Sequence, residues 1–321
     1  MIDKHKIKTD IKEVIAKASE YAEITDSEAL TLSEYSEDSL NDLCRAAGQI
    51  RDHGKGTVIT FSPKVFIPLT RLCRDYCGYC TFRVDPDQTE TLFMNPEEVL
   101  SVAKAGENLG CREALFTLGE RPEQKYPEAK EWLSTNGYDN TLHYLSAMTE
   151  LVVKETKLLP HANPGTMTHR ELSALKDSNP STGIMLESTS DILYQVGGPH
   201  EFAPSKRPIV RLKTIAIAGE LKIPFTTGLL IGIGETMLDR MESLLEIRNL
   251  QRKHSHIQEI IIQNFRAKPK TPMAEFPDAE TQEMLWTVAA ARIILGPQAN
   301  IQVPPNLSSE NYEMYLTAGI N

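Results

Sequence analysis

Three of the five cysteines in this chain of 321 residues lie close together, as Cys73, Cys77 and Cys80 in the spacing C-x3-C-x2-C. Three thiolates can hold a metal centre while one coordination position stays open, whereas a structural site is usually closed by a fourth ligand. Cysteine thiolates are also the usual ligands of cubane iron–sulfur clusters, which ordinarily take four of them. The spacing therefore predicts a reactive metal centre, in which one iron is free to bind a small molecule that carries an amino and a carboxylate group.

Two other interpretations of the cysteines stay open on spacing alone. One is a zinc site closed by Cys44, Cys111 or a histidine, and the other is simple packing of the three thiols in the core. Cys44 and Cys111 are isolated in the sequence, which favours apolar packing for both of them.

Polar side chains that can bind ligands or transfer protons follow several short apolar runs of the sequence. These residues are Glu120, His161, Asn163, Glu187, Glu235, Asn264 and Arg266. If the apolar runs are parallel strands of a barrel, their carboxyl ends lie on one face, and the polar side chains gather around the cysteines. Each also has a simpler explanation: a glutamate can support a helix N-terminus, a histidine can be a hydrogen-bonded core residue, and the glycines of GLLIGIGE (228–235) can serve tight packing.

The elements that must position these residues alternate between short apolar runs and longer amphipathic stretches. Strands are predicted at 65–70, 113–118, 158–163, 183–188, 225–232, 259–265 and 300–305. Helices are predicted at 96–109, 141–157, 209–221, 237–253 and 279–294. Strands separated by helices pair in parallel, because a tight turn cannot join parallel neighbours. The pattern favours an α/β fold of the (β/α) TIM-barrel type, with an open sheet covered on both faces as the alternative.

Two regions are predicted along the chain. Residues 1–56 are polar and helical, with helix starts at Asp26 and Ser36, whereas residues 57–321 form the core barrel. The loop 196–208 is long and rich in Gly and Pro, which is typical of a lid or a substrate loop. We therefore expect a short helical N-terminal extension followed by one catalytic domain.

The composition excludes several classes of partner. The net charge of −10 argues against nucleic acid and anionic membrane surfaces. No apolar run approaches the roughly 20 residues of a transmembrane helix, and the first ten residues lack the apolar stretch of a signal peptide. We expect a cytoplasmic protein, in which thiols stay reduced and clustered cysteines indicate metal binding or catalysis.

The cysteine spacing, with Tyr79 directly before the last cysteine, resembles the radical S-adenosylmethionine (SAM) superfamily. Within it the chain resembles the 7,8-didemethyl-8-hydroxy-5-deazariboflavin synthase family, which comprises a separate radical subunit and the matching N-terminal half of the fused FO synthase. The resemblance runs from about residue 57 to the last residue. It rests on the blocks KVFIPLTRLCRDYCGYCTFR (64–83), CREALFTLGERPE (111–123), YPEAKEWL (126–133), LLPHANPG (158–165), MLESTS (185–190), IPFTTGLLIGIGET (223–236) and QNFRAKPKTPM (263–273).

This resemblance implies a radical SAM carbon–nitrogen lyase. Cys73, Cys77 and Cys80 would bind a [4Fe–4S] cluster, whose fourth iron takes the amino and carboxylate groups of SAM. A 5′-deoxyadenosyl radical would then abstract hydrogen from the adduct 5-amino-5-(4-hydroxybenzyl)-6-(D-ribitylimino)-5,6-dihydrouracil, and ring closure with loss of ammonia would give the deazaflavin. The implied partners are a separate synthase that makes the adduct and an electron donor such as ferredoxin or flavodoxin.

The resemblance also implies roles for residues at the strand ends. Tyr79 would place its backbone near the adenine, and Gly119 and Glu120 would receive the methionine amino group. Glu187 would meet the ribose or the same amino group, and Arg211 would pair with the methionine carboxylate, which suits a forked donor.

Further residues match the family with less defined roles. Gly232 and Glu235 would border the adenosyl group, and His161, Asn163 and Asn264 are candidates for substrate contacts or proton transfer. The chain ends at TAGIN (317–321), where the family ordinarily continues with a DWGG segment. We therefore expect the eighth strand of the barrel to be missing or incomplete.

Two other functions fit parts of the sequence. A related radical SAM enzyme of tyrosine-cleaving or menaquinone-pathway type would share the architecture, although the blocks CRDYCGYCTF and FTLGERPE favour the deazaflavin family. A non-catalytic zinc-binding module belongs to a different class and would need only the cysteines.

Overall fold

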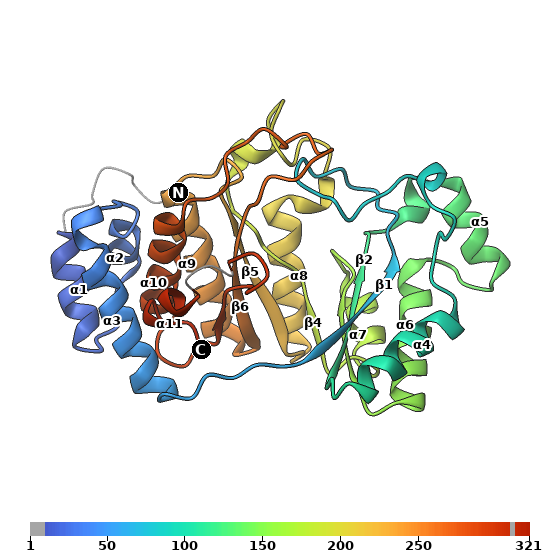
Figure 1. Ribbon diagram of the computed structural model, residues 1–321, viewed down its shortest axis with the longest axis horizontal. Coiled ribbons are helices and arrows are strands. Elements are labelled where there is room, and N and C mark those ends of the chain that lie inside the picture. Colours follow the sequence, from blue (N-terminus) through green and yellow to red (C-terminus); the bar gives the residue numbers. More distant parts are fainter. Residues whose placement is uncertain (1–9, 309–311) are drawn as a thin grey trace.

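The computed structural model describes residues 10–308 and 312–321, and it contains one sheet of seven parallel strands in chain order (Figure 1). The first nine residues of the predicted extension lie outside the described residues. The strands are β1 (Lys64–Thr70), β2 (Glu113–Leu118), β3 (Leu159–Asn163), β4 (Ser181–Gly183), β5 (Phe225–Ile231), β6 (Ile257–Asn264) and β7 (Ile301–Gln302). Parallel pairing of every neighbouring pair confirms the α/β prediction.

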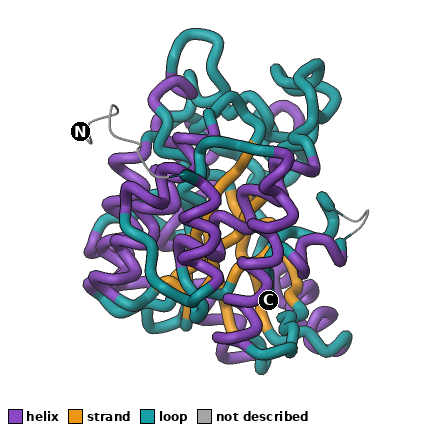
Figure 2. Tube along the Cα trace, turned by 90° about the vertical axis from the view of Figure 1, so that its left-hand side faces the viewer, coloured by secondary structure: helices purple, strands orange, loops and turns teal. Residues whose placement is uncertain are grey.

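Helices connect the strands and cover the outer face of the sheet (Figure 2). They are α4 (Pro96–Asn108), α5 (Pro127–Thr135), α6 (Thr141–Glu155), α7 (His169–Leu175), α8 (Pro208–Glu220), α9 (Met237–His254), α10 (Thr281–Leu295) and, after β7, α11 (Glu313–Thr317). Short 3₁₀ helices lie at Pro86–Gln88, Pro122–Gln124, Asp191–Tyr194 and Pro204–Lys206. Capping boxes begin α4, α7 and α9, where Asn95, Thr168 and Thr236 accept from the third backbone N–H. None of the helices in the described part of the chain is both long enough and apolar enough to cross a membrane.

The fourth strand is where the predicted and observed elements differ most. The apolar run predicts a strand over 183–188, but β4 ends at Gly183 and is only three residues long. Glu187 has a φ of 65°, in the left-handed region that no strand contains. Beyond β4 the chain meets β5 through the isolated bridge between Glu187 and Leu229. The prediction was wrong because burial of Ile184 and Leu186 mimics a strand pattern in an irregular segment.

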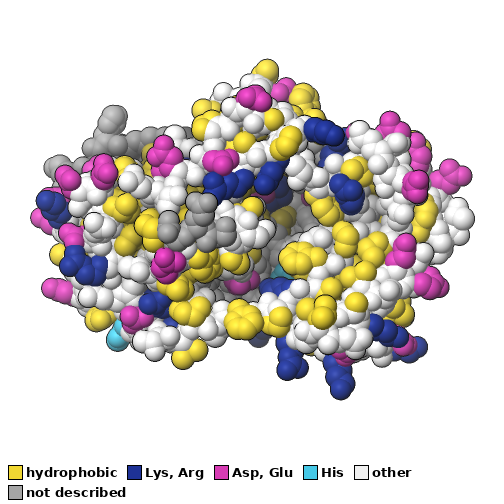
Figure 3. Space-filling view, viewed as in Figure 1, with side chains coloured by type: hydrophobic (Ala, Val, Ile, Leu, Met, Phe, Trp, Pro, Cys, Tyr) yellow, Lys and Arg dark blue, Asp and Glu magenta, His cyan; other side chains and the backbone are white. Residues whose placement is uncertain are grey.

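The sheet curves into an incomplete barrel whose edge strands are β1 and β7 (Figure 1). After β7 the described residues form α11, and these residues contain no eighth strand. The face between the two edge strands is hollowed, with hydrophobic and basic side chains around the hollow (Figure 3). The interior of the barrel is therefore open to the side as well as at its ends.

The N-terminal extension consists of α1 (Ile11–Ser19), α2 (Asp26–Thr31) and α3 (Glu37–Lys55). It packs against α9 and α10 at one side of the barrel (Figure 1). The helix starts predicted at Asp26 and Ser36 are confirmed, since α2 begins at Asp26 and Ser36 precedes α3. Its buried residues belong to the same hydrophobic cluster as those of the barrel. The division at residue 56 remains a prediction about domains.

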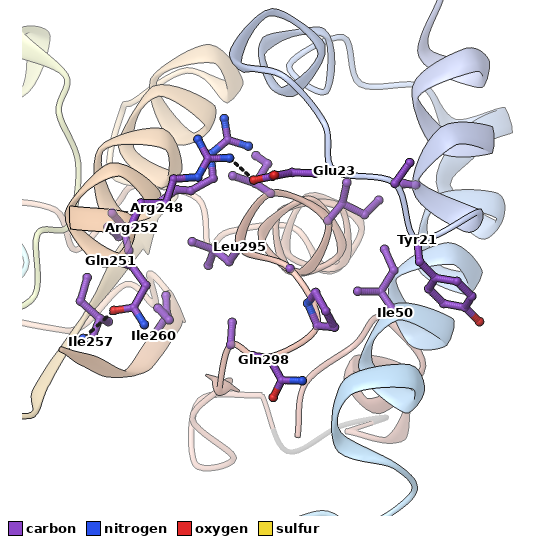
Figure 4. Close-up of a pocket in the computed structure, with 18 residues that line it drawn as sticks. Tyr21, Glu23, Ile50, Arg248, Gln251, Arg252, Ile257, Ile260, Leu295 and Gln298 are labelled. Carbon is purple, nitrogen blue, oxygen red and sulfur yellow. Dashed lines mark hydrogen bonds and ion pairs between the residues drawn. The ribbon is translucent and has the colours of Figure 1, made fainter. Parts of the chain in front are cut away.

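A cavity of about 440 Å³ lies between the extension and the barrel (Figure 4). Its walls include Ile50, Ile260 and Leu295, while Arg248 and Arg252 of α9 lie along one side. The segment 295–299, which also lines it, leads into β7 and thus lies at the amino end of that strand. The cavity is therefore at the opposite end of the barrel from the loop that follows β1.

Candidate active site

The three clustered cysteines lie in the loop between β1 and α4, at the carboxyl end of β1. Within the loop, the N–H of Val84 donates to the carbonyl of Arg71 at 3.1 Å. A second loop, 196–208, holds it from one side, because the N–H groups of Tyr76 and Gly78 donate to carbonyls of that loop at 2.9 and 2.8 Å. From another side Gly78 accepts from the N–H of Met273 at 3.0 Å. The cysteine loop is thus fixed by backbone contacts with two distant segments.

Burial favours the neutral form of two thiols of this loop. All five cysteines of the chain are free of disulfides. Burial raises the pKa of the Cys73 thiol to about 11 and that of Cys77 to about 12. A thiolate at such positions needs a cationic partner, which iron provides. The backbone N–H of Glu120 donates to Cys73 Sγ at 3.2 Å, the kind of hydrogen bond that tunes an iron–sulfur cluster.

The donor set is compatible with an iron–sulfur cluster. In residues 10–308 and 312–321, no three His, Cys, Asp or Glu side chains are arranged to hold one metal ion. In a cubane cluster each thiolate binds its own iron, so the thiols surround a larger group and need not converge on one point.

Gly119 lets the end of β2 approach the cysteine loop. A Cβ at this position would lie 1.9 Å from the carbonyl oxygen of Leu72 and 2.7 Å from Cys73 Cβ, so no other residue fits without a shift. The N–H of Gly119 donates to the carbonyl of Thr70 at 2.9 Å. The sequence predicts Gly119 as a SAM contact, and the structure gives it a packing role beside the first cysteine.

Glu120 follows directly and is buried, with its carboxylate directed toward the end of β3. Its Oε1 accepts from Arg74 Nη2 at 2.7 Å and from Thr166 Oγ1 at 2.6 Å. Gly165 makes room for the same carboxylate, because a Cβ there would lie 2.2 Å from Oε2. The ends of β1, β2 and β3 therefore meet around this one side chain.

Glu187 is the centre of a buried polar network beneath the cysteine loop. Tyr79 donates its hydroxyl to Glu187 Oε2 at 2.5 Å, and His200 Nε2 lies 3.1 Å from the same oxygen. The ammonium group of Lys206 donates to Oε1, and Arg211 Nη1 lies 3.8 Å from it. Burial opposes ionisation of Glu187, but the charges of Lys206 and Arg211 outweigh it and hold the pKa of Glu187 well below its usual range. The carboxylate is charged at neutral pH.

The backbone of Glu187 is held as firmly as its side chain. Its N–H donates to the carbonyl of Gly228 at 2.9 Å, and its own carbonyl accepts from Leu230 at 3.2 Å. These two contacts to β5 stabilise the left-handed conformation, which costs a residue of this type of the order of 1–3 kcal/mol.

Tyr79 and Arg211 contribute to this site through their side chains. Burial, and next the charge of Glu187, raises the pKa of Tyr79 well above its usual range, so its hydroxyl stays a donor. Arg211 is buried, donates from Nε to the carbonyl of Ser205 at 3.0 Å, and donates from Nη1 to the carbonyl of Met185. Its predicted pairing with the methionine carboxylate of SAM stays a prediction, because two carbonyls already engage the guanidinium.

The glycine-rich turn after β5 is shaped from within by Glu235. The Glu235 carboxylate accepts from the N–H groups of Gly232 and Ile233 at 2.8 and 2.9 Å, and from Arg240 Nε at 2.7 Å. Gly232 has a φ of 87°, and a Cβ there would lie 2.7 Å from Ala279 Cβ. Glu235 therefore anchors the turn, and any contact of this turn with a ligand falls to its backbone.

The three candidates for substrate contacts lie lower in the barrel or at its rim. His161 lies between Ser181 Oγ at 2.7 Å from Nδ1 and Asn163 Oδ1 at 3.2 Å from Nε2. Asn264, at the end of β6, donates from Nδ2 to the carbonyl of Leu307 at 3.1 Å. His161 and Asn163 thus lie together, whereas Asn264 is bound to the segment after β7.

Sequence reasoning missed the residues that the loop 196–208 supplies. His200 and Lys206 both contact Glu187, and Ser205 donates its hydroxyl to the buried carboxyl of Asp75 in the cysteine loop. The unusual length and Gly/Pro content of this loop were the available signal, but they do not identify individual side chains.

Comparison with known proteins decides which family this site belongs to. The sequence matches the Radical SAM superfamily over residues 67–247, which is more than half of the chain. A protein named 7,8-didemethyl-8-hydroxy-5-deazariboflavin synthase from Methanopyrus kandleri is 48% identical over 264 residues, which are 82% of this chain and 79% of that relative. The chain belongs to the deazariboflavin synthase family of radical SAM proteins. The resemblance seen in the sequence blocks is thereby confirmed.

Longer proteins contain a region similar to this deazariboflavin synthase family member. The FO synthase of Streptomyces avermitilis is 46% identical over 321 residues, which cover 97% of this chain. This chain spans only 37% of the length of that relative.

Among solved structures, the FeFe-hydrogenase maturase HydG from Carboxydothermus hydrogenoformans has the same fold. It superposes with a TM-score of 0.76 over 97% of this chain and 69% of its own, at 21% identity. At that identity the likeness concerns the fold alone, and it confirms the predicted radical SAM barrel for this deazariboflavin synthase family member.

Proposed function

We propose that this chain is the radical SAM lyase that closes the deazaflavin ring. Its substrates would be SAM and the 5-amino-5-(4-hydroxybenzyl)-6-(D-ribitylimino)-5,6-dihydrouracil adduct. Its products would be 7,8-didemethyl-8-hydroxy-5-deazariboflavin and ammonia, together with methionine and the 5′-deoxyadenosine that takes up the abstracted hydrogen. The observation that carries the proposal is a C-x3-C-x2-C loop fixed at the mouth of an open barrel, in a chain 48% identical to a named deazariboflavin synthase.

Cys73, Cys77 and Cys80 are the residues that would hold a [4Fe–4S] cluster, and SAM would bind beside it at the strand ends. When bound, these two cofactors supply the 5′-deoxyadenosyl radical that starts the reaction. The protein's own part is to hold and orient them. Gly119 allows the Glu120 N–H to reach Cys73, and Glu187, kept ionised by Lys206 and Arg211, offers a fixed acceptor to an amino group or a ribose.

The remaining predicted contacts support the same arrangement. Glu120 lies at the end of β2 beside the first cysteine, where it can receive an amino group if Arg74 or Thr166 moves aside. Gly232 leaves the turn after β5 free of a side chain, so its backbone can approach an adenosyl group. Loop 196–208 covers the cysteine loop and would keep water from the radical.

The reaction also needs partners that this chain does not contain. A separate synthase would make the adduct, and a one-electron donor such as ferredoxin or flavodoxin would reduce the cluster. Relatives with a similar region in a longer chain are compatible with a second activity supplied by another domain or another protein.

The competing functions have less support. A tyrosine-cleaving or menaquinone-pathway enzyme would share the barrel, but the identity of 48% is to a deazariboflavin synthase. A zinc-binding module would need only the cysteines, and it would not account for 48% identity to a named synthase along 82% of this chain.

Anaerobic reconstitution with a matched pair of cysteine variants tests the proposal. The unchanged protein should bind about four irons per chain, cleave SAM to 5′-deoxyadenosine, and convert the adduct to a fluorescent deazaflavin. Cys77→Ala should lose the iron and both products, whereas Cys111→Ser, outside the loop, should keep them. Production of 5′-deoxyadenosine by Cys77→Ala would refute the cluster assignment, and SAM cleavage without deazaflavin from the adduct would refute the ring-closing activity.

A further inference from the structure

The lower interior of the barrel is not filled in the way that such barrels usually are. Branched apolar residues normally dominate the layers inside a (β/α) barrel. Here the inward direction is set by β1, where Val65 packs against Gly106 of α4 on the outside. Successive strand residues alternate between faces, so Lys64 and Phe66 face the interior. The first inward position of this barrel is therefore a lysine.

Neighbouring strands add further titratable side chains to the interior. Lys64 is in register with Glu113 on β2, and Lys64 Nζ lies 3.3 Å from Glu113 Oε2. Burial raises the pKa of Glu259 on β6, and the charges of Lys64 and Glu113 act on the same carboxyl. Because four strands separate β1 from β6 in the sheet, these charges reach Glu259 across the barrel interior. Lys64, Glu113, His161 and Glu259 form what we call the interior polar band.

The interior polar band retains hydrogen-bonding capacity of its own. His161 has both ring nitrogens engaged by Ser181 and Asn163. Glu259, in contrast, is only half-buried, so acceptor positions of its carboxyl can face solvent or a ligand. A half-buried carboxyl on the wall of a hollow can exchange its bound water for the hydroxyl groups of a ligand.

The space beside the band is open. Phe66, inward on β1, is 61% exposed, and Leu159, in register with Glu113, is 55% exposed. Side chains that face a packed barrel core would be buried, so these exposures indicate a hollow interior. Figure 3 shows the hollow on the face between the two edge strands.

The chemistry of the band selects a class of ligand. Two carboxyls and one ammonium group can accept from and donate to hydroxyls, whereas their negative balance disfavours an anionic ligand. The exposed faces of Phe66 and Leu159 can pack against CH groups. A neutral, polyhydroxylated chain satisfies both requirements.

The depth of the band fixes the shape of that ligand. Lys64 and Thr70 are the two ends of β1, so six residue steps of about 3.3 Å place Lys64 roughly 20 Å along the tilted strand from the end where the cysteine loop begins. We propose that the interior polar band binds the polyhydroxylated chain of the substrate, while the reacting part of the same molecule lies above it near the cysteine loop. This inference rests on the proposed function and adds where the ribityl chain is recognised.

The test combines protein variants with a shortened substrate. The reconstituted, SAM-loaded protein is titrated calorimetrically with the adduct and with an analogue carrying a hydroxyethyl group in place of the ribityl chain. The unchanged protein should bind the analogue at least about tenfold more weakly than the adduct. Glu259→Gln, of nearly identical shape, and Lys64→Met should each bind the adduct about tenfold more weakly than the unchanged protein does. In both variants the affinity for the analogue should be only slightly lower than the affinity for the adduct. Glu131→Gln on the exposed face of α5 is the control and should behave like the unchanged protein.

The outcomes separate this inference from the proposed function. If the band were only an internal ion-pair plug, both variants would show the same relative loss on shortening as the unchanged protein, and the inference would be overturned. Deazaflavin formation from the full adduct is measured in parallel. If both variants turn over the adduct and bind it with unaltered affinity, the inference about the interior polar band is contradicted and the proposed function stands. If the unchanged protein neither binds nor converts the adduct, the proposed function is contradicted as well.

Discussion

A carboxylate buried at the mouth of a barrel keeps its charge only where cations are fixed around it. Glu187 meets this condition through Lys206 and Arg211, and it also occupies a strained, left-handed backbone conformation. Strain and buried charge both cost folding free energy, and both concentrate at functional sites. Their coincidence at one residue beside the cysteine loop is the strongest electrostatic argument for the location of the site.

His161 gives the fold a pH dependence that can be measured. Burial, and next the charge of Lys64, lowers the pKa of His161 from 6.5 to about 4. Between these values the unfolded chain takes up a proton that the folded chain refuses, so stability falls as the pH drops through this window. The effect is fully absent above about pH 7 and amounts to about 2 kcal/mol near pH 5.

The variant His161→Gln removes the titrating group. The free energy of unfolding of each protein is measured by urea titration near pH 7 and near pH 5. The decrease between the two pH values should be smaller in the variant than in the unchanged protein by about 2 kcal/mol. Equal changes in the two proteins would show that His161 titrates alike in the folded and unfolded chain.

Residues of the site were predictable from sequence only where type and spacing carry the chemistry. Three cysteines in eight residues predict a metal centre, and Glu187 follows an apolar run. His200 and Lys206 were not predictable, because they reach Glu187 through a long irregular loop whose path depends on tertiary contacts. Glu235 matched the family motif, but its three donors within the chain could not be read from the pattern.

At the scale of elements, the cysteine loop depends on its close contact with the end of β2. In Gly119→Ala the added Cβ would lie 1.9 Å from the carbonyl oxygen of Leu72, so the loop must move. We expect a loss of at least about 1–3 kcal/mol in stability, together with a lower iron content after reconstitution, measured by iron analysis and urea unfolding.

Gly137→Ala is the matched control for this prediction. Gly137 has a φ of 83° but nothing within 4 Å of an added Cβ, so the change costs about 1 kcal/mol of backbone strain. It should leave the iron content unchanged. Full iron content in Gly119→Ala would mean that the close contact is not needed for the site.

Elements were predictable in proportion to the length of their pattern. The prediction of 113–118 matches β2 residue for residue, whereas β4 was misplaced because its three residues carry too little pattern to compete with the apolar segment after it. The helices α5 and α7, of nine and seven residues, were not predicted for the same reason. Short elements take their structure from what they pack against.

At the scale of the whole molecule, the N-terminal extension and the barrel share one core. Helix α10 has eleven buried residues in succession from Met284 to Ile294, so it is covered on all sides by other parts of the chain. The sheet lies on one side of it and α3 on another. The indole N–H of Trp286 donates to the carbonyl of Leu32 at 2.7 Å across this boundary.

This shared core predicts that the extension and the barrel unfold together. The chain has two tryptophans, Trp286 at the boundary and Trp132 on α5, stacked on Phe93 at 4.7 Å between ring centroids. In Trp132→Phe the fluorescence reports the boundary alone, and in Trp286→Phe it reports the barrel alone. In each variant the fluorescence and far-ultraviolet circular dichroism transitions in urea should coincide. Trp286→Phe should also have the lower midpoint, because it leaves the carbonyl of Leu32 without its donor at a cost of about 1–3 kcal/mol. If Trp286 fluorescence instead changed before the circular dichroism signal, the extension would be a separate folding unit, and residue 56 would mark a true domain boundary.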